Sequence, residues 1–186
     1  YNIYNFLAAF MVGLKLNLKP EAMLDSLKTF IPAFGRAEKF NNGVIYLIKN
    51  PVGATQILHT LTPNLKSNDI LLIALNDQIA DGTDVSWIWD VDFELLCHPE
   101  RLAKDLKIYC SGSRAYDLAL RLKYAGLSLD NLTIEPNLEK AFELANKNLS
   151  GKLYVLPTYT AMLEIQKIFT KSGIKKNYWE DTKIEN

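Results

Sequence analysis

From Val44 onward, short apolar segments alternate with longer amphipathic ones, and this alternation restricts the possible folds more than any other feature of the chain. Short continuous apolar runs rich in Ile, Leu and Val predict strands that are buried on both faces. Helices between such strands are typical of a mostly parallel sheet with right-handed crossovers. The predicted strands are 44–48, 70–75, 107–110, 132–135 and 153–156, and the predicted helices are 51–61, 114–125, 138–148 and 159–171.

This pattern predicts a Rossmann-like α/β domain with a mostly parallel sheet. Pro99 predicts one short extra helix before the strand at 107–110. The segment before residue 35 is predicted to be helical and does not show this alternation. Apolar residues at helical spacing predict one helix over 1–16, and Pro20 opens a second helix that reaches about Phe30. We therefore expect three parts: a helical remnant of an upstream domain (1–34), the α/β domain (35–173) and a polar tail (174–186).

The composition excludes several classes of function. The 21 basic residues equal the 21 acidic ones, so the chain lacks the positive excess of a nucleic-acid-binding protein. No apolar stretch is long enough for a transmembrane helix. The chain also lacks an initiator Met and a basic leader, which is typical of a segment of a longer protein.

Metal and nucleotide sites are not predicted either. Cys97 and Cys110 lie in no CxxC pattern, and His59 and His98 are the only histidines, so we expect no metal site in this chain and a cytoplasmic location. No glycine-rich phosphate loop occurs, so the chain has no self-sufficient nucleotide site. We interpret the Cys97-His98 neighbours as a packing or capping pair and Cys110 as a buried strand residue.

The segment 80–94 combines five acidic residues with two tryptophans and follows the predicted strand 70–75. Loops after the carboxyl ends of strands are where open α/β sheets place their sites. The segment therefore predicts recognition or activation of a ligand or partner. Two alternatives stay open: Trp87, Trp89 and Phe93 anchor a long connection while the acids face water, or the alternation around Trp89 forms a short strand.

Three segments, in this order, resemble the Mur ligase family of ATP-dependent amide-forming enzymes of peptidoglycan synthesis. The first is similar to the helix that ends the family's central ATPase domain, the second to the GRxE hinge that opens its C-terminal domain, and the third to its Asn-Pro after the first C-terminal strand. They are Tyr1-Asn2-Ile3-Tyr4-Asn5-Phe6-Leu7-Ala8-Ala9, Gly35-Arg36-Ala37-Glu38 and Asn50-Pro51.

Further segments resemble the MurT type, the Mur-ligase-like subunit of lipid II isoglutaminyl synthase. They are Lys49 to Gly53, Ala80 to Trp87, Ser111 to Ala115 and Leu120 to Lys123. Lys49 departs from ordinary Mur ligases, which carry an acid-His pair before the Asn-Pro. The resemblance implies a GatD-like glutamine amidotransferase partner and amidation of the D-glutamate α-carboxyl in the lipid II stem peptide. It implies use of ATP and Mg²⁺ in the full-length subunit, with the phosphate loop and any zinc site upstream of this chain.

The resemblance also implies roles for individual acids. Asp84 corresponds to the aspartate that the subunit lends to the partner's Cys–His glutaminase site, and Asp90 and Asp92 are the next candidates. Asp81, before Gly82, is interpreted as a turn residue. Two alternatives remain open: Asp84 only caps a turn by accepting backbone N–H bonds, or the acidic Trp-rich loop belongs to a non-catalytic docking module.

For the nucleotide, the resemblance implies contacts from Asn5, Arg36 and Asn50. Arg36 neutralises phosphate oxygens, or alternatively forms an ion pair with Glu38. Asn5 meets the adenine edge, or alternatively caps a helix start. Asn50 caps the helix opened by Pro51 while facing the nucleotide. Three further cations, Arg114, Arg121 and Lys123, are interpreted as a solvated helix face.

Overall fold

The computed structural model describes residues 3–28, 35–97 and 106–174, and the chain divides into two compact units, Tyr1–Ala33 and Phe34–Asn186. The first unit contains helices α1 (Ile3–Lys15) and α2 (Pro20–Lys28). Met23 packs where a side chain on Gly13 would lie, which explains the glycine inside α1. Most large apolar side chains of both helices, including Leu7 and Met11, are exposed in this unit. Both helices were predicted, and the described residues confirm them.

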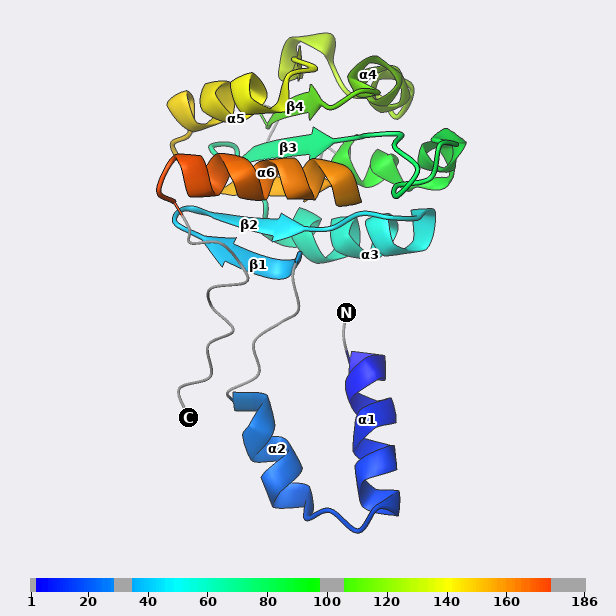
Figure 1. Ribbon diagram of the computed structural model, residues 1–186. Helices are drawn as coiled ribbons and strands as arrows, with labels where there is room; N and C mark the ends of the chain where they lie inside the picture. Colours follow the sequence, from blue (N-terminus) through cyan, green and yellow to red (C-terminus); the bar gives the residue numbers. More distant parts are fainter. Residues whose placement is uncertain (1–2, 29–34, 98–105, 175–186) are drawn as a thin grey trace. The chain divides into compact units, whose positions relative to one another are not determined.

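The second unit is built on a six-stranded sheet of order β1-β2-β6-β3-β4-β5 (Figure 1). Only β1 runs antiparallel, to β2; the other pairs are parallel. The predicted Rossmann-like, mostly parallel fold is therefore confirmed. The strands are β1 (Arg36–Phe40), β2 (Gly43–Tyr46), β3 (Ile70–Ala74), β4 (Lys107–Ser111), β5 (Leu132–Ile134) and β6 (Leu153–Pro157).

Helices cover both faces of the sheet because alternate residues of the central strands point to opposite sides. Leu71 and Ile73 of β3 join one core with α3 (Pro51–Leu61) and α4 (Ala115–Tyr124). Ile70 and Leu72 join the other core with α5 (Leu138–Lys147) and α6 (Tyr159–Lys171). All five residues of β3 are buried, which explains why its sequence is a continuous apolar run.

One alternative for local structure was wrong, and one strand was missed. The segment around Trp89, whose alternation also allowed a short strand, is the 3₁₀ helix η2 (Ser86–Asp90), followed by a second, η3 (Phe93–Cys97). Strand β1 was not predicted, because its charged residues give no apolar alternation; it forms as an edge strand in a hairpin with β2 and contains an irregularity at Ala37 (φ 57°).

Other predictions lie outside the described residues: the short helix after Pro99, the last residues of the second helix and the tail beyond 174. Ile174 itself packs partly buried against the core formed with α5 and α6. No helix in the described part of the chain is long and apolar enough to cross a membrane.

Candidate functional site

Three central strands end in one row at the carboxyl edge of the sheet, because Ala74 of β3 pairs with Pro157 of β6 and with Ser111 of β4. Arg36 reaches the same edge from the antiparallel strand, since it pairs with Tyr46 at the end of β2. The loops that follow these strands carry the residues singled out in the sequence. The candidate site of the second unit is thus where open α/β sheets bind their ligands.

Asn76 joins three of these strand ends. Its backbone N–H donates to Thr158 Oγ1 (3.0 Å), and its side-chain amide donates to Thr160 Oγ1 (3.0 Å) and to Glu164 Oε1 (3.1 Å). Its Oδ1 accepts from the N–H of Ser113 (3.0 Å). All the polar groups of this buried side chain are used, so Asn76 holds the loops after β3, β4 and β6 together.

Asp81 is more than the turn residue that its sequence context predicts. Its Oδ2 does accept from the N–H of Gln78 (3.3 Å), as a turn residue would. Its carboxylate also accepts from Thr160 twice, through the backbone N–H (2.8 Å) and the hydroxyl (2.5 Å). Asp81 therefore ties the loop after β3 to the first turn of α6.

Asp84 is exposed, and its Oδ1 accepts the backbone N–H of Ser86 at 2.8 Å. This bond and a second from the Ser86 hydroxyl hold the pKa of Asp84 below its ordinary value of 3.8. The turn-capping alternative is therefore correct as local geometry. A carboxylate has about four lone-pair directions, so this cap leaves capacity for a further N–H donor.

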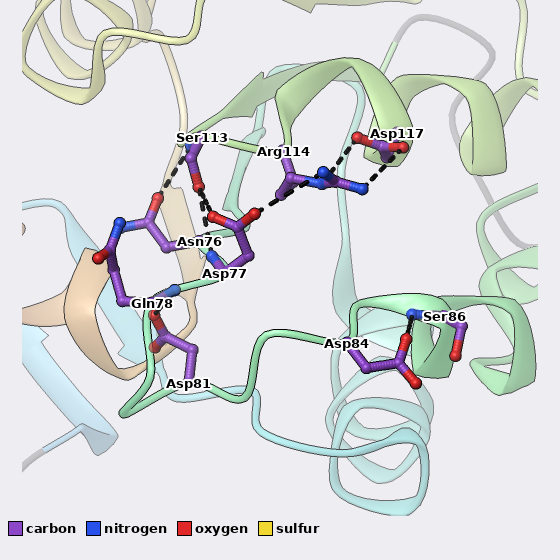
Figure 2. A network of polar contacts seen from close by, with 9 residues as sticks. All are labelled: Asn76, Asp77, Gln78, Asp81, Asp84, Ser86, Ser113, Arg114 and Asp117. Carbon is purple, nitrogen blue, oxygen red and sulfur yellow. Dashed lines mark hydrogen bonds and ion pairs between the residues drawn. The ribbon is translucent and has the colours of Figure 1, made fainter.

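Figure 2 shows Asp84 apart from a second polar cluster, in which Arg114 lies between two acids. Arg114 Nη1 lies 3.7 Å from Asp77 Oδ2, and its Nε lies 3.0 Å from Asp117 Oδ2. Asp77 also accepts the hydroxyl proton of Ser113 at 2.8 Å. Arg114 thus has anionic partners within its own unit and does not neutralise Asp84.

Asp90 and Asp92, the next candidates, are both exposed. Asp92 is fixed through its backbone, whose N–H donates to Thr55 Oγ1 of α3 at 3.1 Å. The apolar residues between the acids point inward, and Val91 and Phe93 are buried in the core on the α3 and α4 side. The half-buried Trp87 and the buried Phe93 anchor the loop, and Asp84, Asp90 and Asp92 face water, as in the alternative in which aromatic residues anchor the connection; Trp89 does not act as an anchor, because it is half-exposed.

Arg121 was interpreted as part of a solvated helix face, and this was wrong: the residue is only 4% exposed. Its Nε donates to Ile88 O (3.2 Å), and its Nη2 donates to Val91 O (2.7 Å) and to Glu94 Oε2 (2.9 Å). Burial of an arginine is tolerated when its N–H groups find acceptors, and here the loop 88–94 accepts from Nε and twice from Nη2. The two other cations of this helix region are less buried than Arg121: Lys123 is exposed, and Arg114 is partly exposed.

Trp89 is the one tryptophan of this loop that stays largely at the surface, with 49% of its area exposed. Its ring lies over the Arg121 guanidinium (5.6 Å) and edge-on to Tyr124 (5.7 Å between centroids). Tyr124 is itself 71% exposed, and Leu120, one turn earlier on α4, is also exposed. Trp87, by contrast, packs half-buried against the core.

The candidate nucleotide contacts lie in two units. Arg36 is exposed, and Glu38 accepts from the N–H of Gly35 (3.0 Å) and from Gln166 Nε2 (2.8 Å). Asn50 caps α3, as predicted, by accepting the N–H of Gly53 at 2.8 Å. Asn5 lies exposed in the first turn of α1, in the other unit.

Neither cysteine shows the lowered thiol pKa that is typical of an activated nucleophile. Burial raises the pKa of the Cys110 thiol to about 12, and burial likewise raises that of Cys97, so both stay protonated near neutrality. Cys110 is buried, as predicted. Within the described ranges, no group of three or more His, Cys, Asp or Glu side chains is placed to hold a metal ion.

Sequence reasoning missed Arg121, Asn76 and Thr160 as residues that shape the site. One available signal was the position of Asn76 just after the predicted strand 70–75, because the sites of open α/β sheets lie outside the carboxyl ends of the strands. Arg121 had no such signal, because its partners lie about thirty residues away in the sequence.

Comparison with curated proteins identifies relatives along most of the chain. This chain is 36% identical over 183 residues to the MurT subunit of lipid II isoglutaminyl synthase (glutamine-hydrolyzing) from Streptococcus pneumoniae. The alignment covers 94% of this chain and 39% of that relative. The Staphylococcus aureus protein of the same name is 32% identical over 176 residues and covers 92% and 39%. The chain therefore spans about two fifths of the length of these relatives.

Solved structures agree on the fold. The alignment with a pseudomurein peptide ligase type C from Methanothermus fervidus covers 92% of this chain and 36% of the ligase chain, at TM-score 0.61 and 17% identity. The alignment with the Mycobacterium tuberculosis folylpolyglutamate synthase complexed with ADP covers 81% of this chain and 35% of the synthase chain, at TM-score 0.55 and 17% identity. The model of the MurT ligase C-terminal family matches residues 47–162, more than half of the chain. The chain belongs to the MurT ligase C-terminal family.

Proposed function

We propose that this chain is the C-terminal part of the ligase subunit of a cytoplasmic lipid II isoglutaminyl synthase. The partner is a GatD-like glutaminase, which releases ammonia from glutamine. The ligase subunit amidates the α-carboxyl of the D-glutamate in the lipid II stem peptide at the expense of ATP. The names of the two curated relatives support the reaction and its dependence on glutamine.

In this proposal Asp84 completes the partner's glutaminase site. A cysteine–histidine pair hydrolyses an amide best when an acid orients the imidazole and offsets its positive charge. The observation that carries the proposal is the placement of Asp84: it is exposed in the loop after β3, and its bond from the Ser86 N–H fixes the carboxylate at the surface.

The ligase half needs ATP and Mg²⁺, and the residues of this chain fit that requirement only in part. Arg36, exposed at the carboxyl edge, fits an anionic phosphate, because its planar guanidinium can bind two oxygens at once. Asn50 lies at the N-terminus of α3, where partial positive charge favours an anion. Among the described residues, no group of three or more His, Cys, Asp or Glu side chains is placed to hold a metal ion. In this proposal the metal site and the phosphate loop belong to the rest of the subunit. ATP supplies the phosphoryl group that activates the carboxylate for attack by ammonia.

The test separates the two half-reactions in the assembled complex of the full-length subunit and its glutaminase. Asp84→Asn retains the size of the side chain but favours the wrong histidine tautomer, and in the serine-protease example such a change lowers turnover by about 10⁴. We expect glutamine-driven amidation to fall by orders of magnitude while ammonia-driven amidation survives. Asp90→Asn and Asp92→Asn are the matched controls. Equal loss of both reactions in Asp84→Asn contradicts the proposal, and loss of neither transfers the role to Asp90 or Asp92.

A second candidate function is a non-catalytic docking module. The edge-on contact between the half-exposed Trp89 and the exposed Tyr124 favours it, because aromatic side chains are enriched in interface centres. The same variant distinguishes the two functions. A docking role predicts that Asp84→Asn weakens binding of the partner, whereas the triad role predicts an intact complex that has lost turnover.

A further inference from the structure

We infer that Asp81 and Thr160 act as positioning residues that fix where Asp84 lies, by clamping its loop onto the start of α6. The inference rests on the proposed function, because the position of Asp84 matters for turnover only if its carboxylate meets a histidine of the partner.

The clamp is a contact at two points. The N–H of Thr160 donates to Asp81 Oδ1 (2.8 Å), and its hydroxyl donates to Oδ2 (2.5 Å). A single bond would let the loop pivot about it, whereas two bonds from one residue also fix the plane of the carboxylate. Asp81 precedes Asp84 by three residues, so its placement determines where the chain enters the Asp84 turn.

Stabilising α6 does not by itself require this arrangement. Helices α3 and α5 are capped locally, by Asn50 and Asn137 three residues before their bonded N–H groups. In α6 the N-cap residue Thr158 makes no side-chain cap, and its hydroxyl instead accepts the N–H of Asn76. The cap comes from Asp81, 79 residues earlier in the chain. A local cap would serve the helix alone, but this long-range cap also couples the loop to the helix.

Thr160 is itself held in place. Its hydroxyl accepts a bond from the buried Asn76, which also bonds Glu164 of α6 and Ser113 after β4. The clamp is therefore fixed relative to three strand ends. Beyond Asp84, the loop is held again where Arg121 binds the carbonyl oxygens of Ile88 and Val91.

Between Asp81 and the buried Val85, residues 82–84 are all exposed, so the clamp is the tertiary anchor on the N-terminal side of Asp84. Gly82 is exposed, and a Cβ at that position would have no heavy atom within 4 Å. The Asp84–Ser86 turn is local and does not depend on Asp81. Loss of the clamp should thus displace Asp84 without changing its ionisation.

The experiment uses the assembled complex of the full-length subunit with its glutaminase. Thr160→Val removes the hydroxyl and retains the shape, whereas Thr160→Ser retains the hydroxyl. Because a misplacement of about 1 Å can lower a rate by about 10²-fold, we expect Thr160→Val to lower glutamine-driven amidation about tenfold or more. Ammonia-driven amidation should stay close to wild type, and Thr160→Ser should restore both rates. Asp81→Ala removes the clamp from the loop side and should change the ratio of the two rates in the same direction.

Asn137→Ala controls for loss of a helix cap, because it removes the local cap of α5. It should lower the melting temperature without changing the glutamine-to-ammonia rate ratio. The clamp is refuted if Thr160→Val and Asp81→Ala leave that ratio unchanged, or lower both rates equally, while Asp84→Asn abolishes the glutamine-driven reaction. If Asp84→Asn itself leaves that reaction intact, the role proposed for Asp84 has failed and passes to Asp90 or Asp92, and this inference fails with it.

Discussion

The guanidinium of Arg121 lies 2.7 Å from the carbonyl oxygen of Val91, so a cation in α4 fixes a loop that precedes it by 30 residues. The same group binds Ile88 O and lies 5.5 Å from the centre of the Phe93 ring. One buried side chain thus holds the backbone and the aromatic residues of the segment that follows Asp84.

We therefore predict that Arg121→Ala destabilises the protein by about 3 kcal/mol, because it leaves buried carbonyl groups without donors. Lys123→Ala is the matched control on the same helix; it is exposed and should change stability by less than about 0.5 kcal/mol. Denaturant unfolding of the two variants measures the difference. Similar stabilities would show that the Arg121 bonds contribute little.

Gly112 and Gly82 provide a second test, because both have a positive φ (89° and 91°) but different surroundings. A Cβ on Gly112 would lie 2.5 Å from Leu75 O and 2.6 Å from Asn76 Oδ1, whereas one on Gly82 would meet nothing within 4 Å. Gly82→Ala should therefore lose only about 1 kcal/mol from its backbone conformation. Gly112→Ala should lose clearly more, since it also displaces Asn76. Thermal unfolding that ranks the two variants equally would contradict this explanation.

The third prediction concerns the ionisation of Asp84. Its pKa in the folded protein lies below the ordinary value of 3.8, chiefly because of the Ser86 N–H bond. The stabilisation linked to this carboxylate is therefore fully present above the unfolded pKa and is lost as pH falls through the lower, folded pKa. Carbon-detected NMR titration of Asp84 should give a midpoint below 3.8.

Ser86→Ala refines this prediction. The variant removes the hydroxyl and retains the backbone donor, so the midpoint of Asp84 should rise only part of the way toward its ordinary value. A midpoint that already equals the ordinary value in the unmodified protein would show that the Ser86 turn does not form in solution.

The sequence predicted the parts of this fold that depend on local pattern. Buried strands such as 70–75 and the helices between them follow from apolar periodicity, and the Asn50 cap follows from the Asn-Pro start of a helix. Strand β1 could not be predicted in this way, because an edge strand buries little and Arg36 to Phe40 is mainly charged or small. Arg121 lies at the border of the apolar face of α4, so its pattern fits an exposed cation equally well.

In the candidate site too, local sequence pattern predicted the location but not the long-range contacts. The acidic loop was located because it follows a predicted strand, but the bonds that shape it connect residues far apart in the sequence. Thr160 and Asp81 are separated by 79 positions, and Asn76 and Thr158 by 82. Such contacts arise only when parallel strands bring their carboxyl ends together. A single sequence does not reveal which side chains then meet.

The hairpin edge of the sheet has a consequence for assembly. Exposed sheet edges invite pairing with strands of other chains, and charged residues or irregularities reduce this tendency. Strand β1 has both, with Arg36, Glu38 and Lys39 along its length and an irregular register at Ala37. The opposite edge strand, β5, is only three residues long. Association by strand addition is thereby disfavoured at both edges, which leaves loops and helix faces as the surfaces through which this domain can engage other proteins.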